Sequence, residues 1–267
     1  MSTSPGQSAP RRVIRRPAVN RPGGPAPWSH LPAAARQGIT VEQVVAALSE
    51  GGLLRVSSEW SGDREPWRAL LGDEDEVRRA AVLVALFEEG GVARVVLTVR
   101  SDRLSTHGGE AAFPGGRLDP DEDVVHGALR EAEEEVALDP ATVTVVAALT
   151  PMPTVASNTV MTPVVATLPG RPRLVASPAE VVRVFDVALD DLVADGAFEE
   201  ELWAVPGRPG ANGIPGEEFP VWFFDVAGET VWGATARTLV ELLCLVLDVE
   251  APASLLRHRR GDSHGLW

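Results

Sequence analysis

The sequence predicts an α/β fold: an α/β/α sandwich in which helices cover both faces of a mixed β-sheet. Two observations support this prediction. The apolar runs at 79–87 and 92–98 are nearly continuous, which is typical of strands buried on both faces. Later in the chain, short strand-like segments alternate with stretches whose apolar residues recur at helical spacing. A sheet with two buried faces needs helices on both sides, and these stretches supply them.

The 267 residues divide by composition into one globular domain with two tails. Residues 1–30 contain five Arg, several Pro and no acidic residue, so we expect a disordered basic arm over 1–35. Its prolines interrupt any amphipathic helix and it has no apolar core, which disfavours a targeting signal. The domain is expected over 36–250, followed by a polar tail over 251–267.

The elements of the domain follow from spacing and turn residues. Thr40 is placed to cap a helix over 41–48, and Gly90-Gly91 separates the two apolar runs as the turn of a hairpin. A long amphipathic helix is expected from Asp123 to Val136. The remaining expectations are strands at 142–149, 160–167, 181–187 and 221–225, a short helix at 189–193, and a helix at 233–247.

Charge and cysteine content limit the partners. The net charge of −14 argues against nucleic acid or an anionic membrane surface as the main partner, and no run approaches the ~18 apolar residues of a membrane span. The single Cys244 excludes an internal disulfide and fits a reducing, cytoplasmic location. It lies in an apolar helical run, which is typical of a core residue. The oligomeric state stays open between a monomer and a homodimer.

The predicted helix at 123–136 carries a group of carboxylates. Glu131, Glu134 and Glu135 are spaced i, i+3 and i+4, so they share one face, while Glu133 points away. Such carboxylates repel unless a hard cation lies among them, and Mg²⁺ or Mn²⁺ prefers oxygen ligands and bridges carboxylates to phosphates. Gly115 lets the backbone approach and offers its carbonyl as a further ligand. The alternative is a solvated acidic helix face.

These residues form part of a longer spacing pattern that resembles the Nudix box. The matching positions are Gly116, Glu122, Arg130, Glu131, Glu134 and Glu135. The resemblance implies the Nudix α/β/α fold and metal-dependent cleavage of a diphosphate. Ala137 departs from the pattern, because the family has Gly there; a left-handed Ala costs ~1 kcal/mol, or the helix runs on.

A second pattern lies upstream and is similar to the signature of the coenzyme A pyrophosphatase branch. It comprises Leu97-Thr98, Arg100-Ser101, Leu104, His107, Gly109 and Phe113-Pro-Gly-Gly116, and Trp232-Gly-Ala-Thr-Ala-Arg237 resembles a later segment of that branch. This resemblance implies a coenzyme A substrate, with Arg100, His107 and Phe113 binding it. Arg100 suits bidentate phosphate binding and His107 suits donation. The alternatives are a structural ion pair for Arg100 and an ordinary loop histidine for His107.

The catalytic roles follow from the family resemblance. It implies that Glu131, Glu134 and Glu135 bind the metal with the Gly115 carbonyl. From their positions in the sequence, Arg130 and Glu122 are expected to pair across the loop and hold it in shape. The general base stays open. The candidates are the box glutamates, Glu180, and the loop pair Glu217-Glu218.

The substrate pocket is less well specified. Its expected walls are 151–158 and 206–220, with Trp203, Trp222 and Phe223 either stacking on the substrate or lying in the core. Three functions remain: hydrolysis of coenzyme A or acyl-coenzyme A, hydrolysis of another nucleoside diphosphate derivative such as ADP-ribose or a dinucleotide, and nucleotide binding without catalysis. The intact carboxylates count against the last.

Overall fold

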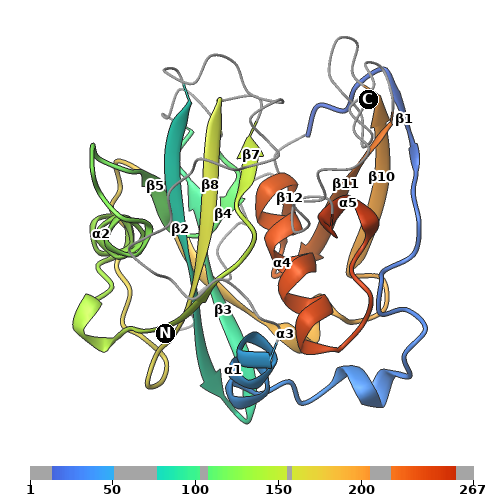
Figure 1. The fold of residues 1–267 in the computed structure, drawn as a ribbon, viewed down its shortest axis with the longest axis horizontal. Helices are drawn as coiled ribbons and strands as arrows, with labels where there is room; N and C mark the ends of the chain where they lie inside the picture. The colour runs from blue at the N-terminus through green and yellow to red at the C-terminus, as the bar shows by residue number, and fades with distance from the viewer. Residues whose placement is uncertain (1–13, 51–76, 103–107, 155–157, 205–217, 257–267) are drawn as a thin grey trace, which may run out of the picture.

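The computed structural model describes residues 14–50, 77–102, 108–154, 158–204 and 218–256 (Figure 1). Two sheets and five α-helices make up this part of the chain. Every helix and strand expected within it forms, with ends shifted by at most two residues.

The larger sheet is mixed and has eight strands. Strand β2 lies near its centre, antiparallel to β3 and parallel to β8, so the mixed α/β sheet expected from the sequence is confirmed. The path runs β4-β3-β2-β8-β6, with β5 paired to β2, β7 to β8 and β9 to β3. The strands are β2 Arg78–Glu89, β3 Val92–Arg100, β4 Ala111–Ala112, β5 Gly115–Arg117, β6 Thr144–Ala148, β7 Met152–Thr154, β8 Thr159–Thr167 and β9 Val181–Ala188.

The hairpin β2–β3 shows why the sheet needs two covering layers. Gly90 and Gly91 have φ of 63° and 78°, the left-handed values of a two-residue hairpin turn. Along β2, alternate residues enter two different hydrophobic clusters: Val84 and Leu86 face one, Leu83 and Phe87 the other. Both faces are therefore buried, as the continuous apolar run predicts.

Helices cover both faces of the mixed sheet. Helix α2 lies on one side, while α4 and the second sheet lie on the other (Figure 1). The helices are α1 Val41–Glu50, α2 Val124–Val136, α3 Leu189–Leu192, α4 Gly233–Val246 and α5 Ala253–Leu256, with 3₁₀ turns at Ala33–Arg36 and Pro140–Thr142. The side chain of Gln43 and that of Thr40 each bond the other's backbone N–H, which caps α1 as expected.

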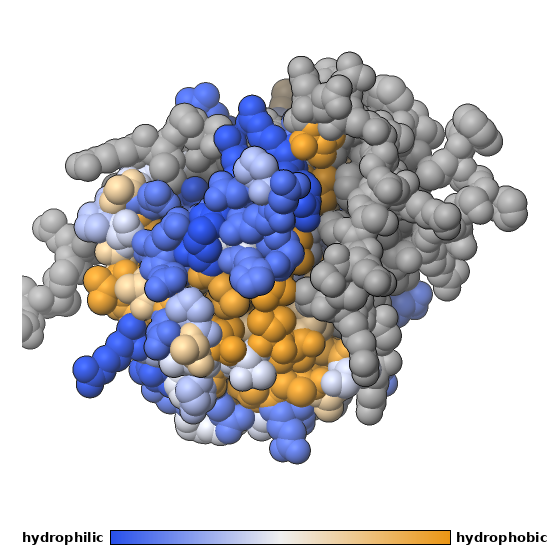
Figure 2. All heavy atoms as spheres, turned by 60° about the vertical axis from the view of Figure 1, so that its left-hand side comes forward, coloured by the Kyte–Doolittle hydropathy of each residue, from blue (hydrophilic) through white to orange (hydrophobic). Residues whose placement is uncertain are grey.

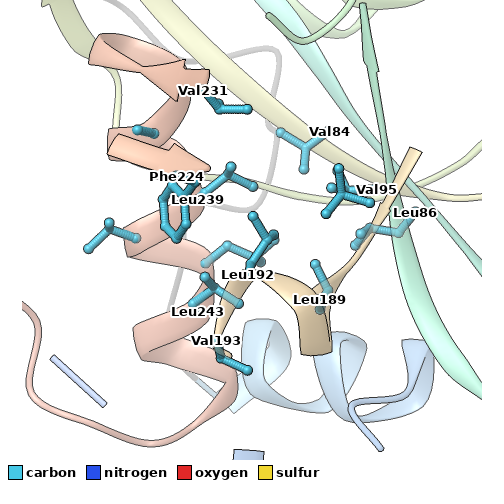
Figure 3. Packing of buried hydrophobic residues seen from close by; sticks show 14 of the residues in the cluster. Val84, Leu86, Val95, Leu189, Leu192, Val193, Phe224, Val231, Leu239 and Leu243 are labelled. Atoms are coloured by element: carbon cyan, nitrogen blue, oxygen red, sulfur yellow. The ribbon is translucent and has the colours of Figure 1, made fainter. Parts of the chain in front are cut away.

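The larger core lies between the mixed sheet and α4 (Figure 3). Leu239 and Leu243 of α4 and Leu192 of α3 are fully buried there beside Val84 and Val95 of the sheet. Cys244 is 2% exposed and belongs to this core, as its apolar surroundings in the sequence predict. The core fixes the sheet on the side opposite α2.

The second sheet was not expected from the sequence as a separate unit. It is antiparallel, in the order β1-β10-β11-β12, and its strands are β1 Val19–Pro22, β10 Phe198–Ala204, β11 Phe219–Val226 and β12 Glu229–Trp232. Trp222 and Phe223 of β11 are 2% and 3% exposed, so both are core residues. Of their two proposed roles, packing is the one the structure shows.

Residues 14–35 correct the expectation of a disordered arm. Strand β1 pairs with β10, and Trp28 is 1% exposed with its ring stacked on Phe224 at 6.3 Å. Two arginines of this segment have acidic partners: Arg16 contacts Glu201 of β10 at 2.6 Å, and Arg21 donates to Glu218 at 2.9 Å. These two basic residues therefore help to dock the segment on the second sheet; residues 1–13 lie outside the described ranges.

The C-terminal boundary also differs from the expected tail. Residues 253–256 form α5, and Leu255 is 3% exposed in the larger core, so the packed domain continues beyond 250. The rest of the expected tail, 257–267, lies outside the described ranges. Among the helices of the described ranges, none has the length and apolarity of a membrane span.

Candidate active site

Helix α2 is held at both ends by specific caps. The side chain of Asp123 accepts hydrogen bonds from the N–H groups of Val125 and His126. At the other end Ala137 adopts φ 55° and ψ 35°, and its N–H bonds the Glu133 carbonyl at 2.9 Å. The helix therefore stops where the family's Gly would stand, and the left-handed Ala costs ~1 kcal/mol.

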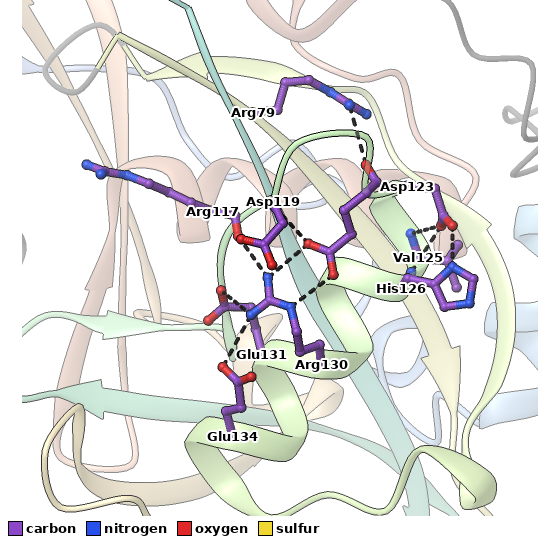
Figure 4. A network of polar contacts seen from close by, with 10 residues as sticks. Arg79, Arg117, Asp119, Asp123, Val125, His126, Arg130, Glu131 and Glu134 are labelled. Carbon is purple, nitrogen blue, oxygen red and sulfur yellow. Dashed lines mark hydrogen bonds and ion pairs between the residues drawn. The ribbon is translucent and has the colours of Figure 1, made fainter.

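Arg130 joins the loop before α2 to the carboxylates on it (Figure 4). Its Nε and Nη2 each donate to Glu122 at 2.9 Å, and Nη2 also donates to the Arg117 carbonyl at 3.0 Å. This bidentate pair confirms the contact expected across the loop. Nη1 reaches Glu131 at 3.1 Å and Glu134 at 3.2 Å, so Arg130 orients two box glutamates at once.

Glu135 is the buried acid of the site. It is 1% exposed, and each of its oxygens accepts one hydrogen bond: Oε2 from the Gly115 N–H at 3.0 Å and Oε1 from Arg100 Nη1 at 3.2 Å. Arg100 is the last residue of β3 and Gly115 the first of β5. Two strands of the sheet thus meet the helix at this carboxylate.

Two further acids lie beside Glu135. Carboxylate oxygens of Glu131, Glu135 and Glu180 all lie within 4.8 Å of one another, and we call these three residues the carboxylate cluster. Glu180 is exposed and directly precedes β9, where its carbonyl accepts the Ser101 N–H at 2.7 Å. A Cβ on Gly116 would lie 2.4 Å from the Glu131 carboxyl carbon, so a larger residue there would displace the Glu131 carboxylate from its observed position.

The environment of the carboxylate cluster disfavours negative charge. Burial raises the pKa of Glu135 to about 7, although the Gly115 N–H and Arg100 act in the opposite direction. Burial also raises the pKa of Glu131, and the charges of Glu134 and Glu180 add to this effect. Carboxylates this close are stabilised in their ionised form by a cation among them.

The donor set of the carboxylate cluster fits a divalent cation. All three residues supply carboxylate oxygens, the ligands that Mg²⁺ and Mn²⁺ prefer, and they converge from a helix and a strand end. Glu134 differs, because its side chain is 57% exposed and it lies outside the cluster, beside Arg130. Its part in metal binding, and that of the Gly115 carbonyl, remain predictions.

The other residues expected at the site have different outcomes. Phe113 was expected to bind substrate, but it is 2% exposed and its apolar ring belongs to the larger core. Glu218 bonds Arg21 at 2.9 Å, so Arg21 holds this candidate base on the second sheet and lowers its pKa. His107 and Glu217 lie outside the described residues.

Sequence reasoning missed the backbone contacts that place the site. The N–H of Ser177 donates to the Glu135 carbonyl at 2.8 Å, and the Glu180 N–H donates to the Ser177 carbonyl at 3.0 Å. Residue 177 therefore ties the end of α2 to the turn that presents Glu180. Backbone donors of this kind leave no signal in the side-chain pattern.

The α2 side of the molecule is strongly hydrophilic over part of its surface. Hydrophilic side chains gather in the upper middle of this face, and an apolar area lies below them (Figure 2). Among the exposed acids on α2 are Glu133 and Glu134.

Comparison with known proteins identifies the family. The NUDIX domain model matches residues 77–206, which include the whole carboxylate cluster. The Nudix hydrolase NudL of Citrobacter koseri is 36% identical over 166 residues, which cover 62% of this chain and 81% of the relative. The chain belongs to the Nudix hydrolase family.

Other members differ in length from this Nudix hydrolase. Mitochondrial Nudix hydrolase 15 of Arabidopsis thaliana is 38% identical over 178 residues, covering 63% of this chain and 58% of the relative. The chain thus spans little more than half of that plant protein. A crystal structure of the Nudix hydrolase RenU of M. smegmatis is 26% identical, covers 47% of this chain and 81% of that one, and has a TM-score of 0.40.

Nudix hydrolases as a family act on diphosphate bonds and generally use divalent metal ions. The six box positions lie together on β5, on the loop that follows it and on α2: Gly116, Glu122, Arg130, Glu131, Glu134 and Glu135.

Proposed function

We propose that this Nudix hydrolase cleaves the diphosphate of coenzyme A or acyl-coenzyme A, giving 3′,5′-ADP and (acyl-)4′-phosphopantetheine, with Mg²⁺ or Mn²⁺. One observation carries the proposal: the upstream signature and the Nudix box meet at the same carboxylate. Arg100 and Gly115, both signature residues, donate to the two oxygens of Glu135.

Backbone hydrogen bonds of other described residues lie close to this contact. The Arg100 N–H bonds the Glu110 carbonyl at 3.0 Å and the Gly109 N–H bonds the Arg100 carbonyl at 2.8 Å, so the loop between them starts and ends beside the carboxylate cluster. Strand β12, which ends at Trp232, lies against β4. The downstream segment that resembles the coenzyme A branch therefore begins next to the strand that follows the signature loop.

Each residue of the site has a separate task in the proposed reaction. Glu131, Glu135 and Glu180 would hold the cation, which would supply neutralisation of the diphosphate charge and activation of water. Arg130 fixes the positions of Glu131 and Glu134. The guanidinium of Arg100 binds a phosphate oxygen of the substrate.

The proposed general base is Glu180 or a box glutamate. Glu180 is exposed at the rim of the carboxylate cluster, where its carboxylate can accept a proton from water and pass it to solvent. Glu134 is also accessible, at 57% exposure of its side chain, but Arg130 already occupies one of its oxygens.

The test is product identification. The purified protein is incubated with coenzyme A and separately with ADP-ribose, in Mg²⁺, in Mn²⁺ and in EDTA, and products are identified by mass. Release of 3′,5′-ADP with 4′-phosphopantetheine, lost in EDTA and in Glu135→Gln, supports the proposal. The Glu133→Gln variant is the matched control, because Glu133 is an exposed acid on the same helix.

Two other results would redirect the assignment. Cleavage of ADP-ribose or a dinucleotide without cleavage of coenzyme A would keep the diphosphatase chemistry and discard the substrate. Nucleotide binding without turnover of any diphosphate would favour a binding module. The proposal also places the enzyme in the cytoplasm, with a small-molecule nucleotide as its partner, as a monomer or a homodimer.

A further inference from the structure

We propose that Arg100 couples cation binding to substrate binding in this enzyme. Its guanidinium balances Glu135 in the cation-free enzyme and turns to the substrate's diphosphate when a divalent cation takes that carboxylate oxygen. This inference rests on the proposed function, because it requires a substrate that carries a diphosphate. It makes Arg100 a positioning residue for the metal as well as a substrate ligand.

The two donors to Glu135 differ in their freedom to move. Oε2 accepts from the Gly115 N–H, which belongs to the backbone of β5, while Oε1 accepts from the side chain of Arg100. The backbone of Gly115 is fixed by strand pairing, since Gly115 lies opposite Val82 of β2. A cation that binds Glu135 therefore replaces Arg100 at Oε1 and leaves the Gly115 contact in place.

Fewer and longer hydrogen bonds hold Arg100 at Glu135 than hold Arg130 at Glu122. Arg130 makes two bonds of 2.9 Å to its partner, whereas Arg100 makes one of 3.2 Å. Among the described residues, Glu135 is the one side chain to which the Arg100 guanidinium donates, although a guanidinium carries five N–H donors. The remaining donors are available to a phosphate.

The backbone of Arg100 keeps the side chain within reach of both partners. Its N–H and carbonyl bond Glu110 and Gly109, and the next residue, Ser101, bonds the Glu180 carbonyl at 2.7 Å. The Arg100 side chain is 23% exposed, so it borders solvent while Glu135 does not. When Arg100 is released from Glu135, its guanidinium can therefore move while strand β3 stays in place. The positive charge of Arg100 then lies beside the diphosphate.

If Arg100 couples the two ligands, its removal changes cation affinity and substrate affinity in opposite directions, which its other possible roles do not predict. Removing Arg100 removes a competitor for the Glu135 oxygen, so the cation binds more tightly in the absence of substrate. The same change removes a phosphate ligand, so the substrate binds more weakly. By reciprocity, the cation strengthens substrate binding less in the variant than in the wild type.

The experiment measures the change in cation affinity and the change in substrate affinity in the same protein. Mn²⁺ affinity without substrate is measured at pH 8 from the signal of free Mn²⁺ in electron paramagnetic resonance, and KM and kcat are measured with coenzyme A. The variants are Arg100→Gln and Arg100→Lys, with melting temperature recorded for each. Arg183→Ala is the matched control, because Arg183 lies opposite Val99 on the adjacent strand β9 and pairs with Glu229 at 2.6 Å.

We expect Arg100→Gln to bind Mn²⁺ about tenfold more tightly, since one hydrogen bond to a charged group no longer competes. Its KM for coenzyme A rises about tenfold, with a smaller change in kcat. Arg100→Lys keeps the charge and falls between this variant and the wild type. Arg183→Ala leaves both constants unchanged.

Two results overturn the inference. Unchanged Mn²⁺ affinity with a raised KM makes Arg100 a phosphate ligand without coupling, and weaker Mn²⁺ binding with a lowered melting temperature makes it a structural ion pair. If the wild type does not cleave coenzyme A, the proposed function fails, and the Mn²⁺ titration still decides whether Arg100 competes with the cation.

Discussion

Two glutamates on helix α2, two positions apart, have opposite environments. Glu135 is 1% exposed and bonded on both oxygens, by Gly115 and Arg100, whereas Glu133 faces solvent. Burial raises the pKa of Glu135 to about 7. A glutamate is therefore a buried acid with a raised pKa on one face of the helix and a solvated charge on the other.

This difference locates the chemistry of the helix. A buried carboxylate with a raised pKa is less stable when ionised, and a bound cation recovers that free energy. On the exposed face a cation would recover no such free energy, because water already solvates the carboxylate of Glu133. The function of α2 is thus expected to reside on the face that contains Glu131 and Glu135.

The sharpest contrast is in activity. Glu135→Gln keeps the shape of the side chain but removes the charge that holds the cation, so we expect kcat to fall roughly 10³-fold. Glu133→Gln should stay within about twofold of the wild type, because that side chain is solvated. Steady-state rates in Mg²⁺ measure both, and equal losses in the two variants would remove the distinction between the faces.

The contrast also predicts a pH dependence of stability in EDTA. The pKa of Glu135 rises from an ordinary 4.5 to about 7, so between those values the folded protein holds a proton that the unfolded chain has released. Unfolding free energy should therefore fall as pH rises from 4.5 to 7, by about 3 kcal/mol, and level off above.

Urea unfolding across this pH range measures the effect. Glu135→Gln should show a shallower fall than the wild type, because Gln does not titrate, while Glu133→Gln should keep the wild-type slope. A Glu135→Gln profile that overlays the wild type would show that Glu135 is not the group responsible.

A smaller effect is expected from the glycine that makes room for Glu131. The Cβ of Gly116→Ala would lie 2.4 Å from the Glu131 carboxyl carbon and push it out of the carboxylate cluster. Displacement of a ligand by about 1 Å costs on the order of 10²-fold in rate. Gly170→Ala is the control, since nothing lies within 4 Å of its added Cβ; similar rates for the two variants would contradict this account.

The smallest change concerns the end of α2. Ala137→Gly should raise the unfolding free energy by ~1 kcal/mol, because glycine adopts the observed φ of 55° without strain. Ala128→Gly, inside the same helix, should lower it by about 1 kcal/mol or more. Thermal unfolding measures both, and a loss of stability in Ala137→Gly would refute the cap.

The mixed sheet was predictable because its signals are local. The apolar run of β2 and the Gly90-Gly91 turn indicate a buried hairpin without reference to the rest of the chain. Strand β10 lacks such a signal, since three consecutive glutamates hide its pattern. Glu201 is buried there with a hydrogen bond on each oxygen, from Arg16 and from Trp203, and the contact with the distant Arg16 cannot be read from spacing.

The contacts of the site also divide into those that the sequence could predict and those that required the fold. Helical spacing places Glu131 and Glu135 on one face, and the sequence also indicated the pair of Arg130 with Glu122. The contact of Arg100 with Glu135 joins the end of β3 to helix α2, 35 positions apart, so it needed the fold. Phe113 was misjudged because a motif does not show which of its residues face the core.

Anomalous X-ray diffraction can locate the cation on the enzyme. Crystals soaked in Mn²⁺, with data collected at the Mn absorption edge, reveal the cation by its anomalous difference peak. We predict a peak among the carboxylates of Glu131, Glu135 and Glu180, which disappears in Glu135→Gln crystals and persists in Glu133→Gln crystals. A peak away from these residues, or one unchanged in Glu135→Gln, would contradict the account.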